Sequence, residues 1–201
     1  MIKKVITIMM VVACVIVFVY PVQAQKKIEM GIKGGLGLAN LTGDVSGTES
    51  MLSFGGGGLF RFSPIPQFSI QPEVLFVLKG AQEKGDNGEK LKLAYIEVPV
   101  LAMYRPPAGE KVSPSFFAGP AISVLVSAKV GSEDIKDEVN STDFGVVFGA
   151  GVDFKAGEKG KVSLDGRYTM GISNIAKDSG NDSVKNGVFS FWVSYLFPLG
   201  Q

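Results

Sequence analysis

The sequence contains no histidine and only one cysteine, Cys14. Histidine is the usual general base near neutral pH, so its absence weighs against the hydrolase and acyltransferase sites that depend on it. Cys14 lies inside an apolar N-terminal run. A chain cleaved behind that run has no disulfide, no reactive thiolate and no cysteine metal site. Its stability must then come from hydrogen bonding and packing.

An excess of charge of either sign is also missing, since the chain has 20 basic and 19 acidic side chains. Lys3 and Lys4 belong to the N-terminal segment, and without them the balance is 18 basic to 19 acidic. Nucleic-acid binding needs a clustered positive charge, so no nucleic-acid partner is expected.

Motifs for cofactors and metal ions are equally scarce. The run Gly34-Gly35-Leu36-Gly37 is not followed by the Lys-Ser/Thr pair of a phosphate-binding loop, and glycine inside a narrow barrel serves to relieve crowding. The acidic cluster at Glu133, Asp134, Asp137 and Glu138 lacks the spacing of a calcium loop, so a solvated loop is the favoured interpretation. We expect no cofactor, no metal and no catalytic residue.

The N-terminus has the pattern of a secretory signal peptide. Lys3 and Lys4 precede an apolar run from Val5 to Tyr20, and small residues lead to a cleavage site after Ala24. A signal-anchor helix is the alternative, because the apolar run is only slightly shorter than a membrane span. The sequence therefore predicts a signal peptide over residues 1–24 and one domain over residues 25–201.

The rest of the chain alternates apolar residues with small or polar ones, which is the period of a β-strand with two different faces. Most of these segments are longer than the strands of soluble sheets, as tilted membrane-crossing strands are. Eight strands are predicted, over residues 28–40, 52–63, 68–81, 92–104, 115–127, 143–155, 161–172 and 188–197.

The links between these segments alternate in kind. Residues 63–67, 105–114 and 156–160 are short or turn-like, whereas four longer polar links begin near residues 42, 82, 128 and 173. Outer-membrane barrels have short periplasmic turns and longer outer loops, and an even strand number leaves both termini in the periplasm. We therefore expect the four longer links to face the cell exterior.

The two faces of the predicted strands differ in chemistry. Even-numbered positions carry the large apolar side chains in the first seven strands, and odd-numbered positions carry them in the last. The opposite face carries charges, glycines and serines. So many phenylalanines would crowd the inside of an eight-stranded barrel, whereas lipid accepts them on the outside. The pattern favours an all-β fold, an eight-stranded antiparallel up-and-down transmembrane β-barrel, over a soluble lipocalin-like barrel. Trp192 is expected to point inward.

Five stretches share a pattern with a known family. Three of them are Gly31-Ile32-Lys33-Gly34-Gly35-Leu36, Ile70-Gln71-Pro72-Glu73-Val74-Leu75-Phe76 and Tyr95-Ile96-Glu97-Val98-Pro99-Val100-Leu101. The other two are Phe117-Ala118-Gly119-Pro120 and Phe148-Gly149-Ala150-Gly151-Val152-Asp153. Together they resemble the PorT-like family of small outer-membrane barrels from Bacteroidota. The resemblance implies an outer-membrane location and a barrel. Some relatives assist a secretion machine, and no active-site residue carries over.

Charged residues on the inward face form the candidate site. Buried charges must be paired to be tolerated, so we interpret them as a structural network that fills the lumen, with a gate or ion path as the alternative. The set comprises Lys33, Arg61, Glu73, Lys79, Glu97, Asp153, Asp165 and Arg167.

The predicted function is that of a non-enzymatic integral barrel in the outer membrane of a Gram-negative cell. It would contact lipid with its outer face and an envelope or extracellular protein with its long loops. A soluble periplasmic carrier of an apolar ligand is the first alternative, and an accessory barrel of a secretion system is the second.

Overall fold

The computed structural model describes residues 27–85, 88–107, 112–157, 160–177 and 182–199. The predicted signal peptide, residues 1–24, lies outside the described residues. In the part of the chain that is described, no helix is long and apolar enough to cross a membrane.

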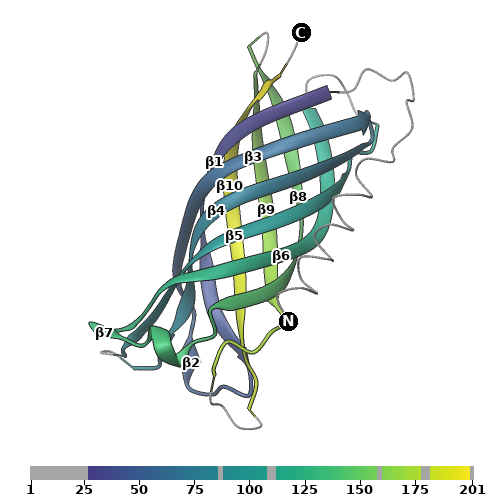
Figure 1. The fold of residues 1–201 in the computed structure, drawn as a ribbon. Coiled ribbons are helices and arrows are strands. Elements are labelled where there is room, and N and C mark those ends of the chain that lie inside the picture. Colours follow the sequence, from purple (N-terminus) through teal and green to yellow (C-terminus); the bar gives the residue numbers. More distant parts are fainter. Residues whose placement is uncertain (1–26, 86–87, 108–111, 158–159, 178–181, 200–201) are drawn as a thin grey trace.

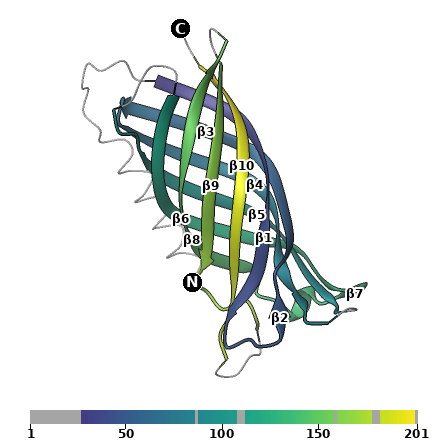
Figure 2. The same cartoon turned by 180° about the vertical axis from the view of Figure 1, so that it is seen from behind.

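Eight long antiparallel strands form a closed barrel (Figures 1 and 2). They follow one another in the chain, and the last pairs with the first over fifteen positions, from Glu29 opposite Pro198 to Gly43 opposite Val184. Closure leaves no long strand with an unpaired edge, as a bilayer requires. The strands are β1 (Lys27–Gly43), β3 (Met51–Ile65), β4 (Phe68–Glu83), β5 (Lys90–Tyr104), β6 (Val112–Val130), β8 (Thr142–Ala156), β9 (Gly160–Gly171) and β10 (Val184–Pro198).

The two ends of the barrel are built differently. At one end, here called the turn end, β1 and β9 begin, β5, β8 and β10 end, and residues 66–67 connect β3 to β4. At the other, the loop end, β2 (Thr48–Glu49) pairs with β4, β7 (Glu133–Asp134) pairs with β6, and η1 (Lys136–Glu138) forms one 3₁₀ turn. Figure 1 shows β2 and β7 at the same end, beyond the body of the barrel.

The predicted strand number and order are confirmed, but most strands are longer than predicted. β6 runs over 112–130 instead of 115–127, and β10 begins at Val184 instead of Val188. Polar and charged residues such as Thr42 and Lys185 continue the β1–β10 ladder, where they are register partners. Backbone hydrogen bonding between the strands extends beyond the segment in which apolar residues alternate, because a β-ladder is made by amide groups and does not need particular side chains.

The predicted faces are also confirmed. Ile32 and Phe191 are 68% and 64% exposed on the outside, whereas Glu73 on the inner face is 1% exposed. Trp192 points inward and is buried. A soluble lipocalin-like barrel needs the reverse arrangement, with the apolar face inside. The exposed phenylalanines are Phe54, Phe60, Phe68, Phe76, Phe116, Phe144, Phe148, Phe154, Phe189, Phe191 and Phe197.

A β-bulge on β6 breaks the alternation. On β5, Ala94 and Tyr95 are consecutive, but their partners on β6 are Ser127 and Leu125, so β6 carries one extra residue there. This bulge reverses the parity beyond it and turns Ala128, an even-numbered residue, completely inward.

Candidate functional site

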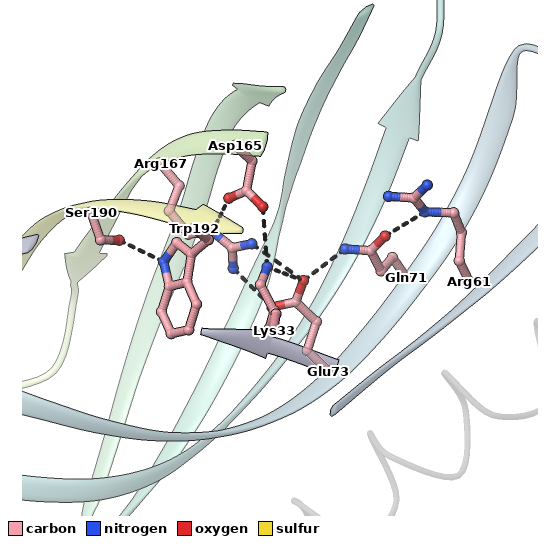
Figure 3. Close-up of polar contacts among 8 residues, drawn as sticks. All are labelled: Lys33, Arg61, Gln71, Glu73, Asp165, Arg167, Ser190 and Trp192. Atoms are coloured by element: carbon pink, nitrogen blue, oxygen red, sulfur yellow. Dashed lines mark hydrogen bonds and ion pairs between the residues drawn. The ribbon is translucent and has the colours of Figure 1, made fainter. Parts of the chain in front are cut away.

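The middle of the lumen holds two cations and two anions in direct contact (Figure 3). Lys33 Nζ lies 3.0 Å from Glu73 Oε1 and 3.2 Å from Asp165 Oδ2. Arg167 donates to both oxygens of Glu73, at 2.8 and 3.3 Å, and its Nε donates to Asp165 Oδ1 at 2.8 Å. These four side chains, the central cluster, satisfy one another, as buried charges must.

Small residues on the intervening strands let the side chains of the central cluster reach one another across the lumen. Lys33 on β1 has Gly57 on β3 and Ser194 on β10 as register partners. Glu73 on β4 and Asp165 on β9 each lie two strands away from β1. Because Gly57 and Ser194 fill little space, the Lys33 side chain reaches carboxylates on both sides.

Trp192 packs beside the central cluster. Its ring lies 5.0 Å from Lys33 Nζ and 5.3 Å from Arg167 Cζ, within the range of cation–π attraction, and its Nε1–H donates to Ser190 Oγ at 2.9 Å. The indole fits because Gly35 and Gly55 face it. A Cβ atom on Gly35 would lie 2.5 Å from Trp192 Cδ2, and one on Gly55 would lie 2.7 Å from Cη2.

A second group, the loop-end cluster, surrounds Lys79. Its Nζ contacts Glu97 Oε2 at 2.7 Å and Asp143 Oδ2 at 3.3 Å, and it lies 5.0 Å from the centre of the Tyr95 ring. Asn186 Nδ2 also donates to Asp143 Oδ2, at 2.9 Å. Glu73 and Glu97 therefore belong to different clusters, although their strands are adjacent.

A third group, the turn-end cluster, closes the opposite end. Arg61 Nη1 donates to Asp153 Oδ2 at 2.6 Å, and Lys161 Nζ lies 2.7 Å from Glu29 Oε1. Arg105 Nη1 donates to Ser69 Oγ at 2.7 Å. Gln71 links this cluster to the central one, because it accepts from Arg61 Nε at 2.6 Å and donates to Glu73 Oε1 at 2.7 Å.

The structure places all eight sequence-predicted site residues on the inner face, where they are buried. Sequence reasoning missed Gln71, Asp143, Lys161 and Asn186, left Glu29 out of the candidate set, and placed Arg105 in a turn. Parity was the available signal for Gln71, Asp143 and Arg105, which continue the odd-numbered inward face of their strands. Asn186 fell in a segment predicted as loop, so no alternation applied to it.

Little room remains in the lumen. Among the described residues, the six cations Lys33, Arg61, Lys79, Arg105, Lys161 and Arg167 face the six anions Glu29, Glu73, Glu97, Asp143, Asp153 and Asp165. The cavity beside Trp192 has a volume of about 20 Å³, which is room for about one water molecule. Charged side chains therefore occlude the lumen.

An apolar cap covers the loop end of the lumen. Val139 and Ile175, from two different loops, are 6% and 3% exposed, and they belong to one buried cluster with Tyr95, Leu125 and Ala128. A β-bridge between Val139 and Ala176 ties the two loops together. The loop that contains Val139 also includes β7 and η1, and its acidic residues are exposed, as predicted.

Comparison with known families agrees with this arrangement. A family described as "Outer membrane protein beta-barrel domain" matches residues 23–177, more than half of the chain. The chain belongs to this outer-membrane β-barrel family. Membership places the barrel in the outer membrane, where its apolar outer face contacts lipid. No curated protein matches the chain.

Solved structures of outer-membrane proteins share the fold of this family member. Neisserial surface protein A is 16% identical, with a TM-score of 0.55 over 82% of this chain and 95% of that one. OprG from Pseudomonas aeruginosa is 14% identical, with a TM-score of 0.56 over 90% and 100%. A major outer membrane protein from Thermus thermophilus is 12% identical, with a TM-score of 0.54 over 86% and 99%.

Proposed function

We propose that this outer-membrane barrel has no enzymatic activity and that it serves the envelope as a structural protein that presents its outer loops to a partner. The observation that carries the proposal is the filled lumen, in which each carboxylate of the central cluster contacts two cations. A carboxylate held in this way is a poor general base, because proton uptake would break its ion pairs. The eight sequence-predicted lumen residues then act as structural residues.

The loop end is the surface left for interaction. In outer-membrane barrels the longer loops face the cell exterior, and here they include β7 and η1, whose acidic residues are exposed. The apolar cap holds two of these loops in place, so a protein partner would meet a preformed surface. The stretches that resemble PorT-like barrels support placing the chain in that subgroup, and a partner in the envelope or outside the cell fits this position.

Ion conductance tests the occlusion on which the proposal depends. Purified protein in a planar bilayer should show no steady conductance. The double variant Glu73→Ala/Arg167→Ala removes one acid and one base, which leaves Lys33 paired with Asp165 and a hollow centre. The turn-end cluster, the loop-end cluster and the apolar cap still close the two ends of its lumen, so this variant should also stay closed. An open porin in the same bilayer serves as the positive control. Sustained conductance steps from the wild-type protein would contradict the structural proposal.

The orientation can be tested separately. An epitope tag inserted between Gly131 and Ser132, at the turn before β7, should bind its antibody on intact cells. A tag inserted between Pro66 and Gln67, in the β3–β4 turn, should bind only after the outer membrane is permeabilised. The opposite result would place the long loops in the periplasm.

We also propose that residues 1–24 are a signal peptide and that residues 25–201 form the mature domain. N-terminal sequencing of protein from the outer-membrane fraction should begin at Gln25. A mature chain that still begins at Met1 would favour the signal-anchor alternative.

A further inference from the structure

Three lysines gather on the outer face of the barrel at the loop end of β5 and β6. Lys92 on β5 and Lys129 on β6 are register partners, so their side chains leave the sheet next to each other on the same face. Lys136, in η1, lies close to them, because its Nζ donates to the Val126 carbonyl of β6 at 3.0 Å. All three side chains are exposed, and together they are here called the lysine patch.

The β-bulge on β6 creates this arrangement. It adds one residue, Val126, that has no register partner on β5, so the two faces of β6 exchange before Lys129. Strict alternation would turn Lys129 inward and Ala128 outward, whereas Ala128 is buried and Lys129 is exposed. The carbonyl of the extra residue is also the group that holds Lys136.

The lysine patch lies at the edge of the apolar outer face. Ile96 on β5, and Val124 and Val126 on β6, are exposed on the outside of the barrel, where such side chains contact the hydrocarbon of the membrane. A strand rises by about 3.3 Å per residue, so Lys92 and Lys129 lie roughly 10–13 Å farther along their strands. Tilted strands and long lysine side chains place the ammonium groups at the depth of the lipid head groups.

The positive charges of the lysine patch are not balanced within the chain. Over the residues that the structure describes, none of its three lysines forms an ion pair. Asp134 on β7 is the register partner of Lys129, but its Oδ1 accepts from the main-chain N–H of Lys136, at 2.9 Å. Like charges directly opposite each other in a sheet are unfavourable, so Lys92 and Lys129 favour an anion from outside the chain.

Lys185 on β10 provides a comparison within the same barrel. It also lies at the loop end on the outward-facing side of its strand, but its register partner is Thr42 on β1 and not a second lysine. On β1 and β8 the outward positions that follow the apolar residues are Asn40 and Thr142, which carry no charge. The lysine patch therefore differs from an isolated surface lysine by its directly opposed charges.

We propose that the lysine patch binds a phosphate group in the head group of an outer-leaflet lipid. The inference rests on the proposed orientation, in which the loop end faces the cell exterior. The outer leaflet of an outer membrane contains lipopolysaccharide, whose lipid anchor carries phosphate. A lysine ammonium group is a compact charge with three N–H donors, and it binds phosphate as a point charge. Lys136 has two N–H bonds left for the phosphate, and Lys92 and Lys129 bring two further charges to it.

Native mass spectrometry of the full mature protein in a maltoside detergent tests the binding. The probes are lipid A, which is the phosphate-bearing anchor of lipopolysaccharide, and the same lipid after removal of its phosphates. Each lysine near an anionic head group contributes roughly fivefold in affinity, so the protein should bind lipid A at least about tenfold more tightly than the dephosphorylated lipid. Equal binding of the two lipids would overturn the proposal.

Variants locate the site. Lys92→Gln/Lys129→Gln should weaken the binding of lipid A at least about tenfold. The matched control Lys155→Gln/Lys185→Gln removes two lysines outside the patch and should change the affinity by less than about twofold, while Lys92→Arg/Lys129→Arg keeps the charges and should retain binding. The variants should keep the faster gel migration of the unboiled barrel, which shows that they fold. Equal losses in the two glutamine variants would refute the role of the patch.

Stability in urea gives a second readout, which a purely structural role would not move. In vesicles of phosphatidylcholine alone, Lys92→Gln/Lys129→Gln should unfold at a slightly higher urea concentration than the wild type, because the variant lacks the repulsion between the two lysines. In vesicles that also contain lipid A it should unfold at a lower urea concentration than the wild type, because the wild type gains stability from the bound lipid. A change of the same sign in both kinds of vesicle would contradict the proposal.

Inorganic phosphate separates a lipid site from a site for a soluble anion. At matched ionic strength, inorganic phosphate at the concentration of lipid A should not displace the lipid, because the acyl chains also hold lipid A against the apolar outer face. Displacement would show that the patch takes free phosphate, and it would overturn the assignment to a lipid. Failure of lipid A to bind would leave the conductance and epitope tests of the proposed function unaffected, so the two failures can be told apart.

Discussion

Glu73 is the residue whose loss should harm the barrel most, because it joins more partners than any other acid of the central cluster. It accepts from Lys33, from two nitrogens of Arg167 and from Gln71. In Glu73→Gln the side chain keeps its shape but loses its charge. Lys33 and Arg167 then share Asp165 as their one remaining carboxylate in the central cluster.

The expected cost follows from burial. Removal of one partner from a buried ion pair costs about 3–5 kcal/mol, because the remaining charge stays desolvated. Whole domains are stable by only about 5–15 kcal/mol, so Glu73→Gln should remove a large part of the free energy of unfolding. With a urea dependence of about 1–3 kcal/mol per molar, the unfolding midpoint should fall by at least about 1 M.

Equilibrium unfolding in urea, in lipid vesicles, measures this loss through the fluorescence of Trp192. Glu133→Gln is the matched control, because Glu133 is exposed on β7 and has no ion pair among the described residues. It should change the free energy of unfolding by less than about 0.5 kcal/mol. The double variant Glu73→Gln/Lys33→Met restores the charge balance and should be more stable than Glu73→Gln alone. A loss below about 1 kcal/mol in Glu73→Gln, or no recovery in the double variant, would refute the reasoning.

Three further outcomes are expected. Gly35→Ala should destabilise the barrel far more than Gly34→Ala in urea unfolding. The new Cβ atom at position 35 would lie 2.5 Å from Trp192, whereas the one at position 34 would have only Gly55 O within 4 Å, at 3.9 Å. Equal losses of stability in the two variants would contradict this packing. Lipids with brominated acyl chains should quench the fluorescence of the single, inward-facing Trp192 only weakly. They should strongly quench the outward-facing tryptophan of the variant Phe191→Trp/Trp192→Phe. Stronger quenching of Trp192 than of the variant would mean that the inner and outer faces are assigned the wrong way round. Ile175→Ser weakens the apolar cap and should therefore speed protease cleavage in the loops that contain Val139 and Ile175. The unboiled variant should still migrate fast on a gel, which shows that the barrel is folded. Unchanged cleavage would show that the cap does not hold the loops.

The fold could be predicted because the two faces of each strand meet different solvents. Lipid selects Phe54 and Phe116 on one side and the narrow lumen selects charges on the other, so the alternation is strong throughout the membrane. Beyond the membrane both faces meet water and the pattern fades, although hydrogen bonding continues. For this reason the strand ends near Thr42 and Lys185 were predicted as loop.

The candidate site was predictable as a set of residues but not as a set of contacts. Parity alone places Glu73 and Glu97 inside the barrel, whereas their partners depend on the stagger of strands that are distant in sequence. The cap was missed because Val139 and Ile175 are isolated apolar residues in polar segments, and single residues have no period. The β6 bulge that turns Ala128 inward likewise leaves no signal in the alternation.

The seam between β1 and β10 has a consequence for how the protein is made. It joins residues more than 140 positions apart, so the last pairing to form is also the one with the longest chain loop to close. Contacts between such distant residues slow folding. Until the final strand arrives, β1 has an unpaired edge that lipid cannot satisfy. Insertion of the barrel must therefore wait for export of the entire chain, and we expect the unfolded protein to depend on periplasmic holding factors during that interval.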